Sequence, residues 1–417
     1  MLEEGGAIAG GPMQAPAMNF YLAYHGENDR ELIETLARFY RQSFPDLSWV
    51  APHCRAPVVL RDRKIRLGVV SKYFGEHAVA WMLFGLLAGV PRDRFEVSAI
   101  TYAGEERSLS TNIRKAVDNV VAVPQDLRRA REGIAEQAFD ILLYADIGME
   151  HVSYFLAFAR LAPVQCVIWG HPDTTGIDTI DYYLSNDLAE PENGQESYSE
   201  QLVRLAGVQS WYPRMPKPER LPDREALGVP AASTFYLCPQ NLIKFHPDMD
   251  APLAAILRRD PAGRLVIFEA RDPNWTRLLL SRWAPVFGEE MARVVVLPQR
   301  SLDAFVAVIA TADVVLDTWP FGGGNTNYQT FAMGVPVVTL PGRWLRGRGT
   351  LAHYRHMGFD DCVAATSSEY VDIAVRLGTD KPYRDEISRR IDARSGTVLE
   401  DEVCIASFVN FLEGVAP

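Results

Sequence analysis

Short apolar runs alternate with helical stretches in two successive series along this chain of 417 residues. Runs of this kind indicate strands joined by helical crossovers, and such connections are typical of parallel sheets. The pattern therefore predicts an α/β protein with two Rossmann-like sheets. The first series comprises residues 65–70, 95–102, 120–123, 139–144, 164–169 and 180–184, and the second comprises residues 234–238, 264–269, 294–297, 312–317 and 335–340.

A polar stretch rich in proline separates the two series, so the domain boundary is expected near residues 213–230. We expect a mobile N-terminus and helical lead over 1–60, a first Rossmann-like domain over 61–215, and a second over 216–417 that includes the final helix, although that helix could pack against either half. Two such domains are expected to face each other across a cleft. Ligands of open parallel sheets gather at the carboxyl ends of the strands.

Composition excludes several classes of function. The net charge of −11 argues against a general nucleic-acid surface, which would need a basic stripe. The five cysteines are scattered singly, which predicts neither a metal site nor a disulfide framework and fits a reducing compartment. No apolar run approaches the roughly 20 residues of a membrane span, and the N-terminus lacks the basic start of a signal peptide. We therefore expect a cytoplasmic protein with no membrane span.

The stretch from Val314 to Thr330 has the pattern of a strand, a glycine loop and a helix start. Gly322, Gly323 and Gly324 would let the backbone approach a ligand closely. The amides of the following helix's first turn would face that ligand with the positive end of the helix dipole. The loop has no lysine of its own and lacks the spacing of a dinucleotide fingerprint. It is therefore predicted to bind a different phosphate-bearing ligand.

A cation for this phosphate is available after another strand of the same predicted sheet. Lys244 lies just past the carboxyl end of that strand, in a run that includes Gln240 and Asn241. A solvated surface lysine is the alternative interpretation, and the nearby glycine loop favours diphosphate binding. Leu297 ends a further strand and Gln299 follows it, where backbone groups could receive a base.

Three turns of the first domain carry the remaining candidates. His77 follows the first strand at a helix start and would face the cleft, although a lone histidine is more often structural. Asp146 follows the fourth strand and could be a base or a routine cap. His171, Pro172 and Thr174 follow the fifth strand in a turn-rich run, for which a capped loop is the alternative. No Ser-His-Asp spacing, HExxH or paired-cysteine signature supports hydrolysis through a known nucleophile motif.

At these residues the chain resembles the O-GlcNAc-transferase-type (SPINDLY-like) protein glycosyltransferases, which include the bacterial cytoplasmic N-glucosyltransferases. The resemblance runs from about Tyr21 to the C-terminus. Its motifs, which occur jointly and in the family's order, are residues 70–77, 160–165, 170–172, 240–244, 312–318, 334–339 and 377–380.

The resemblance implies a GT-B fold and metal-independent transfer from a UDP-sugar, with inversion at the anomeric carbon and no cofactor. Lys244 matches the family's diphosphate-binding lysine, and His77 matches its active-site histidine. Either His77 or Asp146 would be the base. Asn325 and Thr326 match the family's donor-binding positions. Taken with the residues found above, the expected donor-binding residues are Gln240, Asn241, Lys244, Leu297, Gln299, Gly323, Gly324, Asn325, Thr326 and Gln329, and those expected on the acceptor side are His171, Pro172 and Thr174.

The chain departs from the animal O-GlcNAc transferases at three donor positions. They have a histidine in place of Gly324, an aspartate in place of Gln329 and a lysine in place of Gln299. Residues 320–322 and 325–327 look closer to the N-glucosyltransferase branch. The expected donor is thus UDP-GlcNAc or UDP-glucose, and the expected acceptor is a protein side chain. The alternatives are a small-molecule or glycan acceptor for the same donor, and a family member that binds a nucleotide sugar or a partner without catalysis.

Overall fold

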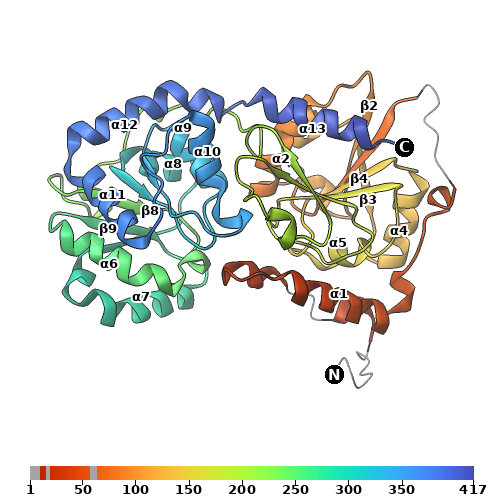
Figure 1. Cartoon of the computed structure of the whole chain (residues 1–417), viewed down its shortest axis with the longest axis horizontal. Helices are drawn as coiled ribbons and strands as arrows, with labels where there is room; N and C mark the ends of the chain where they lie inside the picture. The colour runs from red at the N-terminus through yellow and green to blue at the C-terminus, as the bar shows by residue number, and fades with distance from the viewer. Residues whose placement is uncertain (1–9, 16–18, 57–62) are drawn as a thin grey trace. The chain divides into compact units, whose positions relative to one another are not determined.

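The computed structural model describes residues 10–15, 19–56 and 63–417, which divide into two compact units (Figure 1). Unit 1 comprises Met1–Ala23, Glu27–Trp211 and Glu402–Pro417, and unit 2 comprises Tyr24–Gly26 and Tyr212–Asp401. Part of the predicted mobile N-terminus, residues 1–9 and 16–18, lies outside the described residues. No helix of the described chain is long and apolar enough to cross a membrane.

Unit 1 contains a parallel sheet of seven strands in the order β3-β2-β1-β4-β5-β6-β7 among the described residues. Six of these strands occupy the predicted apolar runs. Strands such as β4 are buried along their whole length, and a fully buried strand is apolar throughout. The seventh, β7, was not predicted, since its sequence QLVRL mixes polar and apolar residues at the edge of the sheet. The strands are β1 Ile65–Val70, β2 Phe95–Tyr102, β3 Asn119–Val123, β4 Ile141–Tyr144, β5 Val164–Ile168, β6 Tyr182–Asn186 and β7 Gln201–Leu205.

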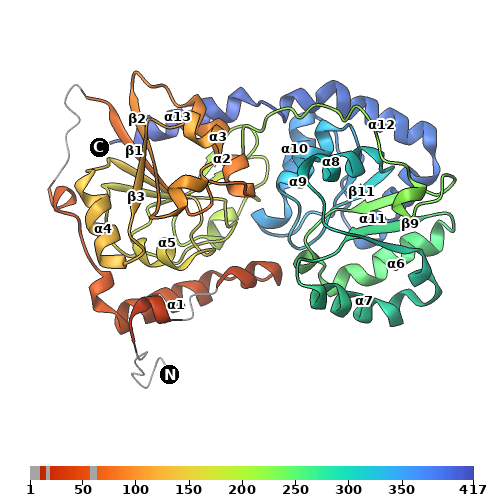
Figure 2. The same cartoon turned by 180° about the vertical axis from the view of Figure 1, so that it is seen from behind.

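Helices cover both faces of this sheet. Figures 1 and 2 show α2, α3 and α13 on one side of the sheet and α4 and α5 on the other, with α1 beyond α5. The buried face of α1 places Tyr40 edge-on against Phe155 of α5, with ring centroids 5.4 Å apart. The helices are α1 Arg30–Ser43, α2 Ala78–Gly89, α3 Thr111–Lys115, α4 Leu127–Glu136, α5 His151–Leu156 and α13 Glu402–Val415.

The final helix, α13, belongs to unit 1, although the sequence analysis assigned it to the second domain. Its apolar side chains pack against unit 1. Phe411 lies edge-on to Tyr182 of β6, with ring centroids 5.4 Å apart. Gly89 of α2 leaves room for Ile405, because a Cβ there would lie 2.4 Å from the Ile405 side chain. The apolar surface that α13 buries is therefore supplied by elements of the first sheet.

Unit 2 contains a parallel sheet in the order β10-β9-β8-β11-β12 among the described residues. In Figures 1 and 2, α6 and α7 lie on one side of it and α8 and α9 on the other. The strands are β8 Phe235–Cys238, β9 Arg264–Phe268, β10 Val294–Leu297, β11 Val314–Leu316 and β12 Val337–Val338. The helices are α6 Asp250–Arg259, α7 Pro273–Phe287, α8 Leu302–Thr311, α9 Asn325–Ala332, α10 Gly349–Met357, α11 Ser367–Thr379 and α12 Lys381–Arg394.

Each sheet has a point where the strand order reverses, between β1 and β4 in unit 1 and between β8 and β11 in unit 2. The loops that leave the carboxyl ends of two such neighbouring strands diverge to opposite faces and leave a crevice at that edge. The loops after β1 and β4 carry His77 and Asp146, and those after β8 and β11 carry Lys244 and the glycine loop. The topology therefore brings the main predicted site residues to these two positions.

Candidate functional site

The buried carboxylate of Asp317 organises the glycine loop of unit 2. Asp317 directly follows β11 and is 1% exposed. One oxygen accepts hydrogen bonds from the Gly323 and Thr318 amides, at 2.8 and 3.0 Å. The other accepts from the hydroxyls of Thr339, at 3.1 Å, and Thr350. Burial raises the pKa of Asp317, and these donors oppose that shift by stabilising the charged form. This role was not predicted from the sequence, although an acidic residue that ends an apolar strand before three glycines could have signalled it.

Position 323 has room only for glycine. A Cβ at this position would lie 2.3 Å from Asn327 Oδ1 and 2.6 Å from Gln240 Nε2. Gly324 then occupies the N-cap position of α9, where no side chain caps the helix. The first-turn amides, which begin at Asn325, thus have no side-chain cap, and the positive end of the helix dipole lies at the loop.

Lys244 contacts a backbone carbonyl of the same loop. Its Nζ donates to the Gly322 carbonyl at 2.6 Å and to Gln240 Oε1 at 3.3 Å. The turn that carries it is shaped by Asn241, whose Oδ1 accepts from the Ile243 amide at 3.2 Å. An ammonium has three protons, so two acceptors within the described chain leave one proton for a ligand oxygen.

The charge state of Lys244 is sensitive to this environment. Burial lowers the pKa of Lys244 to about 8, although the nearby charge of Asp317 opposes the shift. The ammonium also lies 4.7 Å from the centre of the Phe321 ring, a distance typical of a cation–π contact. Lys244 is therefore largely charged at neutral pH, and its charge can be lost in mildly alkaline solution.

Three buried polar atoms at the loop have no hydrogen-bond partner within the described residues. They are Gln240 Nε2, Asn325 Oδ1 and Asn327 Oδ1. Leaving such atoms unpaired costs roughly 1–3 kcal/mol each, so they are characteristic of sites that receive a polar ligand. Together with Lys244 and the start of α9, they make a surface suited to an anion that carries further polar groups.

The other predicted donor residues have separate contacts. Leu297 is buried at the end of β10, and its carbonyl accepts from the Glu269 amide at 2.8 Å. Gln299 is exposed and its side chain donates to the Glu269 carbonyl. Gln329 is buried, and its Nε2 donates to the Tyr212 hydroxyl at 3.3 Å.

Thr326 lies at the loop itself, directly after Asn325 in the first turn of α9. Its carbonyl accepts from Thr330 Oγ1 at 2.7 Å. Donor binding by Thr326, as by Leu297, Gln299 and Gln329, stays a prediction.

In unit 1, Asp146 fixes the turn that leaves β1. Asp146 is wholly buried, and its Oδ2 accepts from the Lys72 amide at 2.8 Å and from Ser71 Oγ at 3.1 Å. Burial raises the pKa of Asp146 to about 6, while hydrogen bonds that include those from Lys72 and Ser71 oppose the shift. The carboxylate is thus ionised at neutral pH and ties the end of β1 to that of β4.

His77 is the N-cap of α2. Its Nδ1 accepts from the Val79 amide at 3.2 Å, and its ring stacks on Tyr73, with centroids 4.4 Å apart. Tyr73 in turn donates from its hydroxyl to the Met149 carbonyl at 3.2 Å. Because a neutral imidazole carries its proton on the nitrogen that does not accept, this cap assigns the proton to Nε2. In that tautomer Nε2 is a hydrogen-bond donor.

His171 lies beside the loop after β4. It is 4% exposed and stacks on Phe20, with ring centroids 5.3 Å apart. Gly148 makes room for it, because a Cβ there would lie 2.5 Å from His171 Cδ2. Pro172, the next residue, is partly exposed. The turns after β4 and β5 are therefore packed together.

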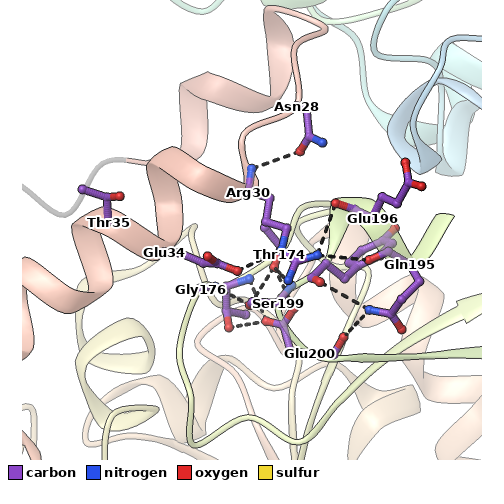
Figure 3. A network of polar contacts seen from close by, with 12 residues as sticks. Asn28, Arg30, Glu34, Thr35, Thr174, Gly176, Gln195, Glu196, Ser199 and Glu200 are labelled. Carbon is purple, nitrogen blue, oxygen red and sulfur yellow. Dashed lines mark hydrogen bonds and ion pairs between the residues drawn. The ribbon is translucent and has the colours of Figure 1, made fainter. Parts of the chain in front are cut away.

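Thr174 belongs to a polar network that Figure 3 shows between α1 and the segment before β7. Its hydroxyl donates to buried Glu200 at 2.7 Å, and the Ser199 amide donates to that hydroxyl at 3.0 Å. Gln195 links Glu200 to Arg30 of α1 through backbone carbonyl contacts. These bonds fit the alternative of a held loop, and the acceptor-side role of Thr174 stays a prediction.

No group of His, Cys, Asp and Glu side chains among residues 10–15, 19–56 and 63–417 is arranged to hold a metal ion. The five cysteines are free thiols.

Comparison with known proteins identifies a family. The model of glycosyl transferase family 41 matches residues 52–212 and 212–401. A probable UDP-N-acetylglucosamine–peptide N-acetylglucosaminyltransferase SPINDLY from Solanum lycopersicum is 26% identical over 76% of this chain and 35% of its own length. A UDP-glucose:protein N-beta-glucosyltransferase from Actinobacillus pleuropneumoniae is 26% identical over 61% of this chain and 41% of its own. The chain thus spans about a third of the length of the first curated relative and two fifths of the second.

Solved structures agree with the family match. A mutant O-GlcNAc transferase from Thermobaculum terrenum has a TM-score of 0.78 and 26% identity, covering 95% of this chain and 76% of that one. Anabaena HepE in complex with UDP-glucose has a TM-score of 0.59 and 13% identity, covering 84% of this chain and all of that one, which is a likeness of fold alone. The predicted α/β fold of the GT-B type is confirmed.

Proposed function

Because this chain belongs to glycosyl transferase family 41, we propose that it transfers GlcNAc or glucose from a UDP-sugar to a protein side chain. The observation that supports the proposal most directly is the bond of Lys244 to the Gly322 carbonyl beside the uncapped start of α9. Relatives whose names specify UDP-N-acetylglucosamine or UDP-glucose, with a peptide or protein acceptor, support the two donors and the acceptor class.

In the proposed reaction a nucleophile of the acceptor attacks the anomeric carbon, and the bond from that carbon to the diphosphate breaks with inversion. Negative charge then builds on the departing UDP. The Lys244 ammonium and the first-turn amides of α9 would stabilise that charge, since fixed donors and dipoles need no reorganisation during the reaction. The same groups would allow transfer without a metal.

His77 is proposed to contact the acceptor. Its Nε2–H would donate a hydrogen bond that orients the incoming group, because the Nδ1 lone pair already caps α2. A base role would need the other tautomer and would break the cap. Asp146 would act through the turn at Ser71 and Lys72, which it binds.

Calorimetric titration of the full chain with UDP tests the donor site. We expect binding by the wild type and a loss of at least about tenfold in affinity for Lys244→Ala, since a charged hydrogen bond to phosphate is worth about 1.5–3 kcal/mol. Lys381→Ala is the matched control, because Lys381 is an exposed lysine paired with Asp385 on α12. No binding by the wild type, or equal binding by Lys244→Ala, would overturn the assignment.

The acceptor class is tested by mass spectrometry of host proteins co-expressed with the chain. A protein glycosyltransferase leaves hexose or N-acetylhexosamine adducts that are absent when Lys244→Ala is expressed. UDP-sugar turnover that requires a small molecule or glycan, without protein adducts, would support the alternative acceptor class. UDP binding without any turnover would support a non-catalytic role.

A further inference from the structure

A short segment near the N-terminus packs against the proposed donor loop. Tyr24–Gly26 belongs to unit 2, although the residues on either side of it belong to unit 1. The Tyr24 ring lies nearly parallel to that of Phe321, at an interplanar angle of 12° and with centroids 4.6 Å apart. Phe321 directly precedes the three glycines of the loop. From the sequence, this segment was expected to belong to the helical lead before the first domain. The family model does not include it, since its match begins at residue 52.

The far end of the segment is held by its backbone. Gly26 has a φ of +80°, and its carbonyl accepts a hydrogen bond from Trp344 Nε1 at 3.0 Å. A Cβ at Gly26 would lie 2.8 Å from the side chain of Pro320, the residue before Phe321. Any side chain here would be strained in conformation and would collide with the loop. The segment therefore docks at two separate points, a ring at Tyr24 and a close backbone approach at Gly26.

The docked segment and Lys244 share one contact partner. The Phe321 ring meets both the Tyr24 ring and the Lys244 ammonium, and Lys244 donates to the carbonyl of the next residue, Gly322. A stacked aromatic pair restricts the rotamers of both rings. Holding Phe321 therefore also restricts where the ammonium can lie, and a charge that is fixed before the ligand arrives binds more tightly than one that must be ordered.

We propose that Tyr24–Gly26 is a positioning element of the donor site, which holds Phe321 and thereby Lys244 in place for a nucleoside diphosphate. This inference rests on the proposed function, since it requires that the loop bind such a ligand. Tyr24 is a positioning residue within it: it acts through Phe321 and need not touch the donor.

The test is the affinity of the full chain for UDP, measured by calorimetry together with the melting temperature of each variant. Tyr24→Ala is expected to weaken UDP binding about three- to tenfold, the effect of one lost aromatic pair. Tyr24→Phe, which keeps the ring, is expected to bind like the wild type. Tyr21→Ala is the matched control, because Tyr21 is an exposed tyrosine that lies just outside the segment and packs on Phe20.

A second variant keeps the test decisive if Tyr24→Ala is poorly folded. Gly26→Ala keeps the tyrosine at position 24 and is expected to weaken UDP binding in the same direction, because its methyl group would push the segment away from Pro320. A merely structural role would lower the melting temperature and the active fraction while leaving the dissociation constant of the folded fraction unchanged. That result, or wild-type affinity for both variants, would overturn the inference. A wild-type chain that does not bind UDP would instead overturn the proposed function.

Discussion

A 2.8 Å hydrogen bond joins the carboxylate of Asp317 to the amide of Gly323, six positions further along the chain. The bond closes the loop on the end of β11. Because the same side chain also accepts from hydroxyls of Thr339 and Thr350, one buried charge connects the loop to two other segments of unit 2. The shape of the loop thus depends on a residue that need not contact the ligand.

Asp317→Asn tests this dependence. The amide keeps one acceptor oxygen but presents hydrogens to donors, so at least one buried group loses its partner. We expect the free energy of unfolding to fall by roughly 1–3 kcal/mol and UDP affinity to fall with it. Urea unfolding of the full chain measures the first quantity. Asp385→Asn, on the surface of α12, should match the wild type, and equal stability of the two variants would contradict the organising role of Asp317.

The affinity for UDP should decrease as the pH rises through about 8. Burial lowers the pKa of Lys244 to about 8, so the ammonium is present below that pH and is lost above it. Calorimetry between about pH 6.5 and 9.5 measures the change. Lys244→Arg should bind UDP without this alkaline decline, because a guanidinium stays charged throughout the range. A wild-type affinity that is constant to pH 9.5 would show that Lys244 does not supply the charge.

Replacement of His77 should separate transfer from donor binding. His77→Ala is expected to bind UDP like the wild type while losing transfer by roughly 100-fold, the typical effect of removing one orienting donor. His77→Asn is the informative partner, because asparagine can cap α2 through its own oxygen. It should restore the melting temperature but not the transfer rate. Unchanged turnover in both variants would make His77 a structural cap alone.

Asp146→Asn distinguishes a positioning carboxylate from a general base. The asparagine oxygen can still accept from the Lys72 amide, so transfer at pH 7.5 should stay within about fivefold of the wild type. Below pH 6 the wild-type carboxylate gains a proton, since burial raises the pKa of Asp146 to about 6. The wild-type rate should then fall, whereas the variant should lack this acid decline. A loss above about 100-fold at pH 7.5 would instead identify Asp146 as the base.

The sequence predicts most strands because buried parallel strands are continuously apolar. The run of β4 is an example, and the motifs after β1, β8 and β11 follow directly from strand ends. β7 was not predicted because its burial depends on a single neighbouring strand. α13 was assigned to the wrong unit because the apolar face of a helix does not indicate which sheet it covers. Contacts such as Gln329 with Tyr212, or Tyr24 with Phe321, join residues more than 100 positions apart, and no local pattern encodes them.

The place of α13 has a consequence for the order in which the protein is made. Unit 1 starts to emerge from the ribosome first, yet its sheet lacks the helix that covers β6 and α2 until Glu402–Val415 has been synthesised. Unit 2 is continuous over Tyr212–Asp401 and can assemble its sheet in the meantime. The first sheet can therefore be fully covered only after the whole of unit 2 has been translated.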